Sequence, residues 1–527
     1  MKNSTSSPIF FFLFIISSAS FISRIFFGID FTDEFQHYLQ LKSLIENKEL
    51  FKNDLFFQQV VYLLIYPVLA LYKNVYGFEN FLLFGRVLLS LIALSFFVII
   101  YTILKKNRFS SIYASITSAS IILSSITIGV FSINYNSITF LFFSLFMSQF
   151  LTWRADARSI IITPVFSIFA NPFIALIMFG LTWLRLLTEG QNVRLLKIII
   201  FQIMFLGLVY YLFSPYIDGK LLLTSIEFTR DFDIGNALFG SKPQLVALFL
   251  IGISYVLTKS WTEKNLNSLS LIFFLAFIFF FLFFGLIDSK EYKIFNTLTI
   301  AFLALTLMTK IYFYINEEHK KAVGWFILAT LLFSLTFALS SSNGLNQIFV
   351  PLGIASVIIF FFDLKAKKDQ SANYVFLLIP LLILLNTLFD GYREKGAIFT
   401  DTSIQEFPEL RYIRTTHQKH EYLIETAKEL SYLKDRKVTF IGNKPINYVI
   451  TDSNPETCMI FMRDNINLIN NNSLRNCLKL KDPEYVVTFL DHNKNSTLRQ
   501  EFFPLHIKCY KKATKVINYE LCGKREF

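Results

Sequence analysis

Long apolar runs separated by short polar loops dominate the chain up to about residue 390. Many of these runs extend over about 17 to 23 residues, which as helices reach across a hydrocarbon core of about 30 Å. From about residue 391 the runs stop and charged residues become more frequent. The pattern predicts a multi-span α-helical membrane protein with a small C-terminal α/β domain. About 13 transmembrane helices are expected, near residues 9–28, 81–104, 109–131, 137–153, 159–170, 172–187, 197–213, 244–258, 269–287, 294–314, 322–340, 348–364 and 372–389.

Two regions follow from this change in composition: a transmembrane body over residues 1–390 and a soluble domain over 391–527. Between the first two spans, residues 29–80 form an outer loop with an expected short helix over 36–50. The apolar run 60–71 is too short to span the bilayer and polar residues frame it, so it is expected to lie along the membrane interface. In the soluble domain the pattern predicts a helix over 420–435, strands over 437–441, 448–450 and 485–490, and a hairpin over 506–521.

The distribution of charge orients the chain across the membrane. A net charge of +12 raises the question of nucleic-acid binding. However, Lys and Arg gather in alternate loops, which is typical of cytoplasmic loops, so no nucleic-acid partner is expected. With an odd number of spans, the N-terminus is expected in the cytoplasm and the C-terminal domain outside, in a multi-pass protein of the inner (plasma) membrane. The basic clusters lie at 105–108, 154–158, 185–197, 259–264, 310–321 and 365–368.

The four cysteines support the same orientation. Cys458, Cys477, Cys509 and Cys522 all fall in the soluble domain and none falls in the transmembrane body. An even number in one extramembrane domain predicts two disulfides, which form in an oxidising, extracytoplasmic compartment. Four cysteines allow three pairings, and the sequence does not choose among them. Four reduced, buried thiols are the alternative.

Candidate chemistry lies immediately after the first span, in residues 28–38. This segment holds Asp30, Asp33, Glu34 and His37. Placing an ionised side chain in the membrane costs up to about 3 kcal/mol at the bilayer centre and less at the edge of the hydrocarbon core. Such residues therefore usually line a functional cavity. A carboxylate whose pKa is raised by burial also suits a general base. The alternative is a solvated loop in which the charges merely end the first helix.

The outer loop resembles that of the GT-C class of membrane glycosyltransferases, in particular the branch of the protein O-mannosyltransferases and aminoarabinose transferases. The resemblance rests on Asp33-Glu34 with His37-Tyr38 directly after the first span, on the aromatic, Pro-containing segment 62–67, and on 77–79 leading to Arg86. It extends to the number of spans and to the extracytoplasmic C-terminal domain. It implies a transferase that takes a sugar from a polyprenyl-phosphate donor.

The resemblance also implies roles for individual residues. Asp33 would be the base that deprotonates the acceptor, and Glu34 would orient the acceptor or support the site. The donor's lipid tail would lie in the bilayer, and the acceptor would be a lipid, a glycan or a protein at the outer, periplasmic face. Residues expected to bind the substrates are Asp30, His37, Tyr38, Gln58, Gln59, Arg86 and Lys290.

The identity of the positive group that would bind the donor's phosphate stays open. The aminoarabinose-type enzymes carry Lys-Pro-Pro where this chain has Gln58-Gln59, which offers no positive charge. Negative charge grows on the leaving phosphate, so a positive group is needed there. A divalent metal such as Mg²⁺ or Mn²⁺, held by Asp33 and Glu34 or by Asp231 and Asp233, is the other solution. The side chains that lie in predicted outer loops or at outer span ends are Arg86, Lys220, Arg230, Lys290 and Lys293.

Other outer segments and other function classes complete the expectations. The polar turns at 132–137 and 340–346 could line a sugar pocket or could simply be tight turns. The long loop 215–244 could close over an acceptor. A transporter or flippase of a lipid-linked or small solute is the main alternative function, although neither an internal repeat nor paired intramembrane charges are visible. A polysaccharide polymerase or ligase and a non-catalytic scaffold are further alternatives.

Overall fold

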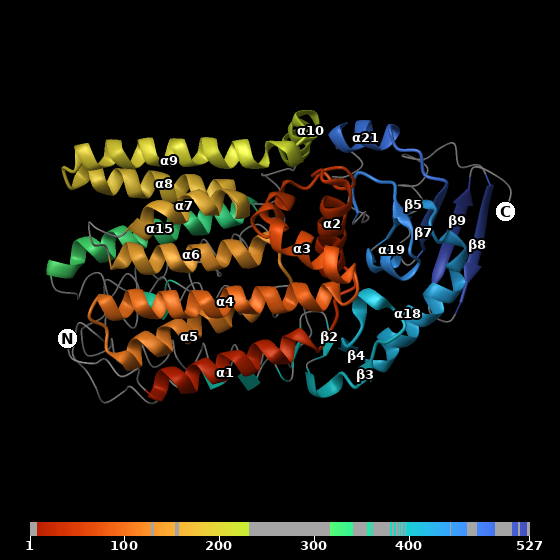
Figure 1. The fold of residues 1–527 in the computed structure, drawn as a ribbon, viewed down its shortest axis with the longest axis horizontal. Coiled ribbons are helices and arrows are strands. Elements are labelled where there is room, and N and C mark those ends of the chain that lie inside the picture. Colours follow the sequence, from red (N-terminus) through yellow and green to blue (C-terminus); the bar gives the residue numbers. More distant parts are fainter. Residues whose placement is uncertain are drawn as a thin grey trace, which may run out of the picture.

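A bundle of long helices forms one end of the molecule, and the C-terminal elements form the other (Figure 1). Two elements of the outer loop, α2 (Asp33–Asn47) and α3 (Tyr66–Tyr76), lie between them. The computed structural model describes residues 8–127, 131–152, 158–230, 317–340, 397–442, 444–460, 472–490, 508–514 and 517–523, with isolated positions between 355 and 395.

Within the described residues, eight helices of the bundle coincide with predicted spans. They are α1 (Pro8–Ile25), α4 (Phe81–Lys106), α5 (Ser111–Thr127), α6 (Tyr135–Leu151), α7 (Arg158–Ala170), α8 (Pro172–Thr188), α9 (Asn192–Phe213) and α15 (Glu317–Ser340). Four of the described helical segments are long and apolar enough to cross a membrane: Pro8–Ile25, Phe81–Lys106, Asn192–Tyr216 and His319–Phe337. The count of about 13 spans stays a prediction, because 244–258, 269–287 and 294–314 lie outside the described residues and 348–364 and 372–389 are described only at isolated positions.

The outward surface of the bundle is apolar, as a bilayer requires. On α9, the side chains of Ile203, Met204 and Leu208 are each more than half exposed. In water such a surface would be unfavourable, whereas lipid chains are as apolar as these side chains. All backbone groups of a helix interior are satisfied within the helix, which is the other condition for crossing a bilayer.

Lysine side chains gather at one end of the bundle. Lys105 and Lys106 end α4, and Lys320 and Lys321 lie in the first turns of α15. These basic ends lie at the end of the bundle that is farthest from the C-terminal sheet (Figure 1). The positive-inside rule assigns that end to the cytoplasm, which is compatible with an extracytoplasmic C-terminal region.

The C-terminal region contains a five-stranded mixed sheet with strand order β6-β5-β7-β9-β8. β5 pairs in parallel with β6 and β7, while β9 pairs antiparallel with β7 and β8. The predicted helix, two of the predicted strands and the hairpin are confirmed. The elements are α18 (His417–Glu429), β5 (Lys437–Ile441), β6 (Asn454–Pro455), α21 (Asn472–Lys479), β7 (Tyr485–Phe489), β8 (Lys508–Ala513) and β9 (Asn518–Gly523).

The predicted strand over 448–450 is wrong, because these residues belong to the short helix α19 (Ile446–Ile450). All five residues of α19 are buried. A short, fully buried apolar run has no period that separates strand from helix. Pro445, with φ −55° and ψ −24°, is already in the helical region, so the chain turns into a helix directly after it.

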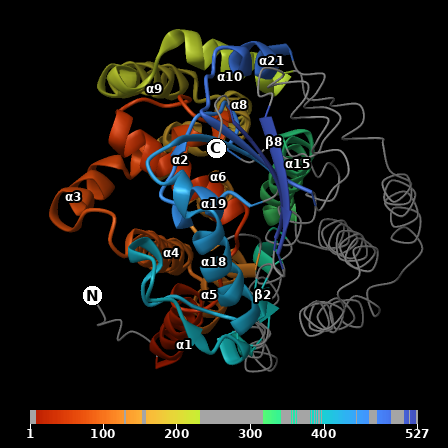
Figure 2. The same cartoon turned by 90° about the vertical axis from the view of Figure 1, so that its right-hand side faces the viewer.

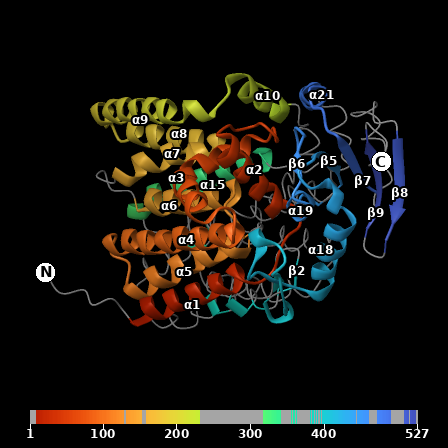
Figure 3. The same cartoon turned by 45° about the vertical axis from the view of Figure 1, so that its right-hand side comes forward.

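The C-terminal region is docked on the outer loop rather than tethered to it (Figures 2 and 3). Phe27 pairs with Arg414 as an isolated parallel bridge, directly after α1. The backbone N–H of Leu55 donates to the carbonyl of Cys458 at 2.9 Å. Leu55 also packs into a hydrophobic cluster with six residues of the C-terminal region: Ile441, Cys458, Met459, Leu474, Leu478 and Val486. The outer loop and the C-terminal region therefore share a core.

The two predicted disulfides are present, and the structure settles their pairing. Cys458 is bonded to Cys477 and Cys509 to Cys522. The first bond ties the segment after β6 to α21. The second joins directly opposed residues of the β8–β9 hairpin. The alternative of four reduced thiols is not what the structure contains.

Cys477→Ala is expected to lower the free energy of unfolding by about 3 kcal/mol, because the closed loop restricts the unfolded chain. The cysteines of that loop are 19 residues apart. Amide hydrogen exchange at Leu55 should also become faster, since Leu55 packs on Cys458 and donates to its carbonyl. Cys522→Ala is the matched control and should leave exchange at Leu55 unchanged. Equal exchange in both variants would contradict the coupling.

Candidate functional site

The first turn of α2 is held by Asp30, which lies just before the helix. Its Oδ2 accepts hydrogen bonds from the backbone N–H groups of Asp33 (3.0 Å) and Glu34 (3.4 Å). Its Oδ1 accepts from both the N–H and the hydroxyl of Thr32. A carboxylate in this position satisfies N–H groups that have no partner within the helix. The geometry favours this capping role over the predicted contact of Asp30 with substrate.

Glu34 and Arg86 form a buried, bidentate ion pair. Nε of Arg86 donates to Oε1 of Glu34 and Nη2 donates to Oε2, both at 2.8 Å, and the two side chains are 2–3% exposed. Nη1 donates to the carbonyls of Arg24 (3.3 Å) and Ile25 (3.0 Å), and Nη2 also donates to that of Gly28 (2.7 Å). A guanidinium has five N–H donors. All five N–H donors of Arg86 thus bind the end of α1, the carbonyl of Gly28 or Glu34 at the start of α2. The geometry therefore favours a structural role of Arg86 over the predicted contact with phosphate.

Asp33 points to a different face of α2 from Glu34. It is half-buried, and its carboxylate interacts electrostatically with His37, one turn along the helix, and with Tyr135. Tyr135 forms hydrogen bonds with the side chains of Gln58 and Asn136. The structure therefore brings together three of the predicted residues, Asp33, His37 and Gln58, with the first turn of α6.

The polar turn before α6 is ordered by its own hydrogen bonds. Oδ1 of Asn134 accepts from the backbone N–H of Ser137 at 2.9 Å and caps α6. Nδ2 of Asn134 donates to the carbonyl of Ser132 at 2.9 Å. Tyr135 and Asn136 are held between these residues, at least partly exposed, next to Asp33. Amide and hydroxyl groups in such a turn can bind sugar hydroxyls.

A network of buried polar side chains begins at His37, one turn after Asp33 on α2. Nδ1 of His37 is 2.9 Å from the hydroxyl of Tyr62, which donates to Oε1 of Gln40 at 3.0 Å. Nε2 of Gln40 donates to Asp54 at 2.9 Å, and Gln36 donates to the same carboxylate at 3.1 Å. Burial lowers the pKa of His37, and the nearby Asp33 opposes that shift. Through Tyr62, His37 links α2 to the segment that follows it.

Asp54 joins this network to the C-terminal region. Its carboxylate accepts hydrogen bonds from the backbone N–H groups of Phe56 and Ile460. It is 1% exposed, and burial raises its pKa to about 6, although these hydrogen bonds oppose the shift. Asp54, Gln36 and Gln40 were not among the residues predicted from the sequence. A single acid between apolar runs, together with two glutamines four residues apart on one helix, was the available signal.

Asp54→Asn is expected to flatten the pH dependence of stability. A carboxyl group whose pKa is higher in the folded state stabilises the fold at low pH, and that contribution is lost as pH rises through the folded pKa. The wild-type protein should therefore lose thermal stability relative to the variant between about pH 4 and about pH 6. Thermal unfolding of the full-length protein in detergent measures this difference. Parallel curves for the two proteins would contradict the expectation.

The other predicted residues do not join Asp33. Tyr38 packs against Phe81, with ring centroids 5.8 Å apart, on the α4 side of α2. Nε2 of Gln59 donates to the carbonyl of Phe56 at 3.1 Å and also to that of Asp54, so Gln59 holds its own loop. Lys220 is exposed at the start of α10 (Gly219–Arg230). Lys290, Lys293, Asp231 and Asp233 lie outside the described residues, and Arg230 is described only by its backbone.

Metal binding gains no support among the described side chains. Both carboxylate oxygens of Glu34 are engaged by Arg86, which disfavours Glu34 as a ligand for a divalent ion. In the part of the chain that the structure describes, one group of potential ligands lies close together: Cys509, Glu520 and Cys522. Its two cysteines are bonded to each other, so they offer no thiolate.

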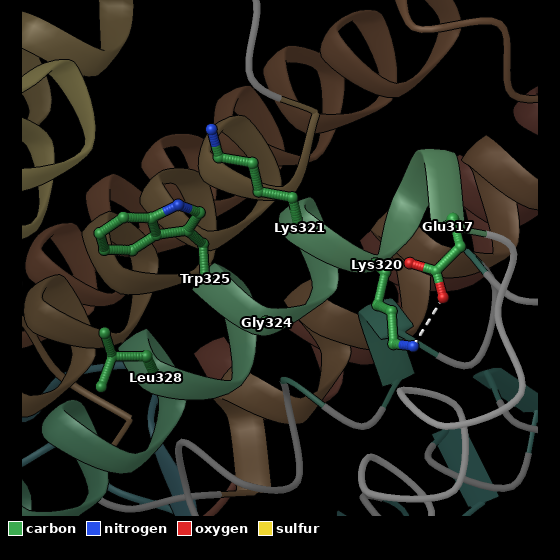
Figure 4. A pocket seen from close by; sticks show the side chains of 6 residues that line it. All are labelled: Glu317, Lys320, Lys321, Gly324, Trp325 and Leu328. Carbon is green, nitrogen blue, oxygen red and sulfur yellow. Dashed lines mark hydrogen bonds and ion pairs between the residues drawn. The ribbon is translucent and has the colours of Figure 1, made fainter. Parts of the chain in front are cut away.

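A cavity of about 470 Å³ opens on the first turns of α15, lined by Glu317, Lys320, Lys321, Gly324, Trp325 and Leu328 (Figure 4). Lys320 forms an ion pair with Glu317 at 2.7 Å. Trp325 contacts Phe150 near the end of α6, whereas Tyr135 at the start of α6 lies beside Asp33. The cavity is thus at the opposite end of the bundle from Asp33 and is not part of the candidate site.

Comparison with known proteins adds no relative to this picture. No protein-family model, no curated protein and no solved structure matches the chain. The resemblance to the GT-C glycosyltransferases therefore rests on the sequence pattern alone: the residues of the outer loop, the expected number of spans and the C-terminal domain.

Proposed function

We propose that the protein is a glycosyltransferase that moves a sugar from a polyprenyl-phosphate donor to a lipid, glycan or protein acceptor at the outer face of the inner (plasma) membrane. The observation that carries the proposal is the position of Asp33. Its half-buried carboxylate interacts with Tyr135, which forms a hydrogen bond with Gln58. Asp33 begins α2, which lies between the bundle and the C-terminal region (Figure 1). Its neighbour Glu34 is fully engaged by Arg86, so Asp33 is the better general base of the two.

In the proposed reaction Asp33 accepts the proton of the acceptor's hydroxyl group. The acceptor oxygen forms a bond to the anomeric carbon of the sugar as the bond from that carbon to the phosphate oxygen breaks. The products are the glycosylated acceptor and the polyprenyl phosphate, with inversion at the anomeric carbon. Gln58, Tyr135 and Asn136 offer amide and hydroxyl groups that suit sugar hydroxyls.

The surroundings of the site suit a lipid-borne donor. Asp33 follows the end of α1 at Ile25 by eight residues, which keeps it near the rim of the membrane. On α3, the side chains of Val68, Leu71 and Val75 are exposed along one face. An apolar stripe of this kind on a helix outside the spans is typical of an interfacial helix. A headgroup bound at Asp33 could therefore keep its isoprenoid chain in the bilayer.

Reconstitution of the full-length protein in vesicles tests the proposal. Vesicles that contain extracted polyprenyl-phosphate sugars and candidate acceptors should release free polyprenyl phosphate and yield the glycosylated acceptor. Mass spectrometry of the glycans lost in a deletion strain would identify the acceptor to supply. A transporter would instead move the labelled lipid-linked sugar between leaflets without any acceptor. Such movement without transfer would refute the proposed function.

A further inference from the structure

The proposed reaction requires a positive group at the leaving phosphate, and Arg86 has no N–H donor left for it. The candidates predicted from the sequence for this positive group all lie in outer loops or at outer span ends of the transmembrane body. The structure instead places basic side chains of the C-terminal region against residues 27–33, the segment that leads from α1 to Asp33.

Arg414 lies closest to the end of the first span. Its backbone N–H donates to the carbonyl of Phe26 at 2.7 Å, and its carbonyl accepts from Gly28 at 2.9 Å. Its guanidinium lies 5.8 Å from the centroid of the Phe27 ring. Phe27 comes two residues after α1 ends at Ile25, and a long basic side chain at the end of a span can reach lipid headgroups.

Lys419 and Lys444 lie further along the same segment. Nζ of Lys419 donates to the carbonyl of Ile29 at 2.5 Å and lies 5.0 Å from the centroid of the Phe31 ring. Nζ of Lys444 lies 4.0 Å from the centroid of the Tyr422 ring, and that ring lies 5.3 Å from Phe31. The two ammonium groups therefore flank one pair of aromatic rings, two residues before Asp33.

The position of Lys444 follows from the sheet. Lys444 lies just beyond the carboxyl end of β5, two residues after Gly442, which has φ 139°. A Cβ at Gly442 would lie 2.9 Å from Cβ of Phe489, so this position requires glycine. Two residues after Lys444, the N–H of Ile446 donates to the carbonyl of Phe31 at 3.3 Å. The carboxyl edge of the parallel strands thus faces the outer loop, and this edge is where open α/β sheets bind ligands.

We propose that Arg414, Lys419 and Lys444 bind the phosphate of the polyprenyl-phosphate donor at the membrane rim beside Asp33. This inference rests on the proposed function, which supplies the donor. Positively charged side chains stabilise a phosphate whose negative charge grows as the sugar leaves.

A titration that needs no chemistry tests the inference. Fluorescently labelled polyprenyl phosphate is titrated into the full-length protein in nanodiscs of phosphatidylcholine. Lys419→Gln and Lys444→Gln are each expected to weaken binding about tenfold, because each removes one charge-assisted contact. Lys434→Gln is the matched control, since Lys434 is an exposed lysine of the same region that pairs with Asp452 on the surface. It should bind as the wild-type protein does.

Two further measurements distinguish a specific phosphate site from general attraction of anionic lipids and from a purely structural role of the two lysines. Phosphatidylglycerol should compete only weakly with polyprenyl phosphate. Equal affinity of the wild-type protein for both lipids would mean general binding of anionic headgroups and would overturn the inference.

In the transfer assay, Lys419→Gln and Lys444→Gln should raise the KM for the donor more than they lower kcat. A purely structural role of the two lysines would instead lower the thermal stability and leave KM unchanged. Normal binding by both variants alongside active transfer would overturn the inference and leave the proposed function standing. Weakened lipid binding by both variants, together with a wild-type protein that transfers no sugar, would support the phosphate site and overturn the proposed function.

Discussion

Asp33→Asn is expected to lower the rate of sugar transfer by about 10²–10⁴-fold, the usual contribution of a general base. Asparagine keeps the size of the side chain but does not accept a proton from the acceptor. The backbone N–H of Asp33, which bonds to Asp30, is unaffected, so the first turn of α2 should persist. The initial rate of transfer in reconstituted vesicles measures the effect.

Asp401→Asn is the matched control for Asp33→Asn. It makes the same chemical change at an exposed carboxylate of the C-terminal region. Transfer by this variant should equal that of the wild-type protein. Transfer by a well-folded Asp33→Asn variant at the wild-type rate would remove Asp33 from the mechanism, and with it the basis of the proposed function.

Arg86→Met is expected to destabilise the protein by about 3–5 kcal/mol, because it leaves the carboxylate of Glu34 buried without its partner. It also leaves the carbonyls of Ile25 and Gly28 without their donors. The end of α1, the start of α2 and the first turns of α4 should loosen together, since Arg86 is the residue that joins them. Thermal unfolding in detergent and protease sensitivity of the outer loop measure this loss.

A double variant separates the lost charge pair from lost packing. Glu34→Leu combined with Arg86→Met removes both charges, so it should recover part of the stability that Arg86→Met loses. Lys434→Met provides an exposed comparison, because the pair of Lys434 with Asp452 is about 60% exposed and should contribute about 0–1 kcal/mol. A loss for Arg86→Met no larger than that for Lys434→Met would contradict the structural role of Arg86.

Much of the fold could be predicted because hydrophobic length is a local property. The bounds of α4 and α8 differ from the predicted spans by only one or two residues, since the apolar runs themselves end there. The strand β5 was predicted for the same reason. The strand predicted over 448–450 failed because a run that is buried on all sides carries no period.

The candidate site was predictable only in part. The sequence singles out the acidic segment after the first span, but neighbouring residues of a helix point to different faces. Asp33 therefore lies beside Tyr135, whereas Glu34 lies against Arg86. That division of roles depends on where α4 and α6 pass, which the spacing of residues along α2 does not encode.

By itself the sequence determined that this is a membrane protein of many helices, which of its ends carry basic loops, and that a cysteine-containing domain follows the last apolar run. These properties depend on the length of apolar runs and on the placement of charge, both of which are local. Only the tertiary structure decided the pairing of the four cysteines, the engagement of Arg86 by Glu34, and the contact of Lys419 with the segment before Asp33. Those contacts join residues that are distant along the chain, so local sequence does not encode them. Burial of Leu55 among apolar side chains of the C-terminal region stabilises the docking of that region on the outer loop.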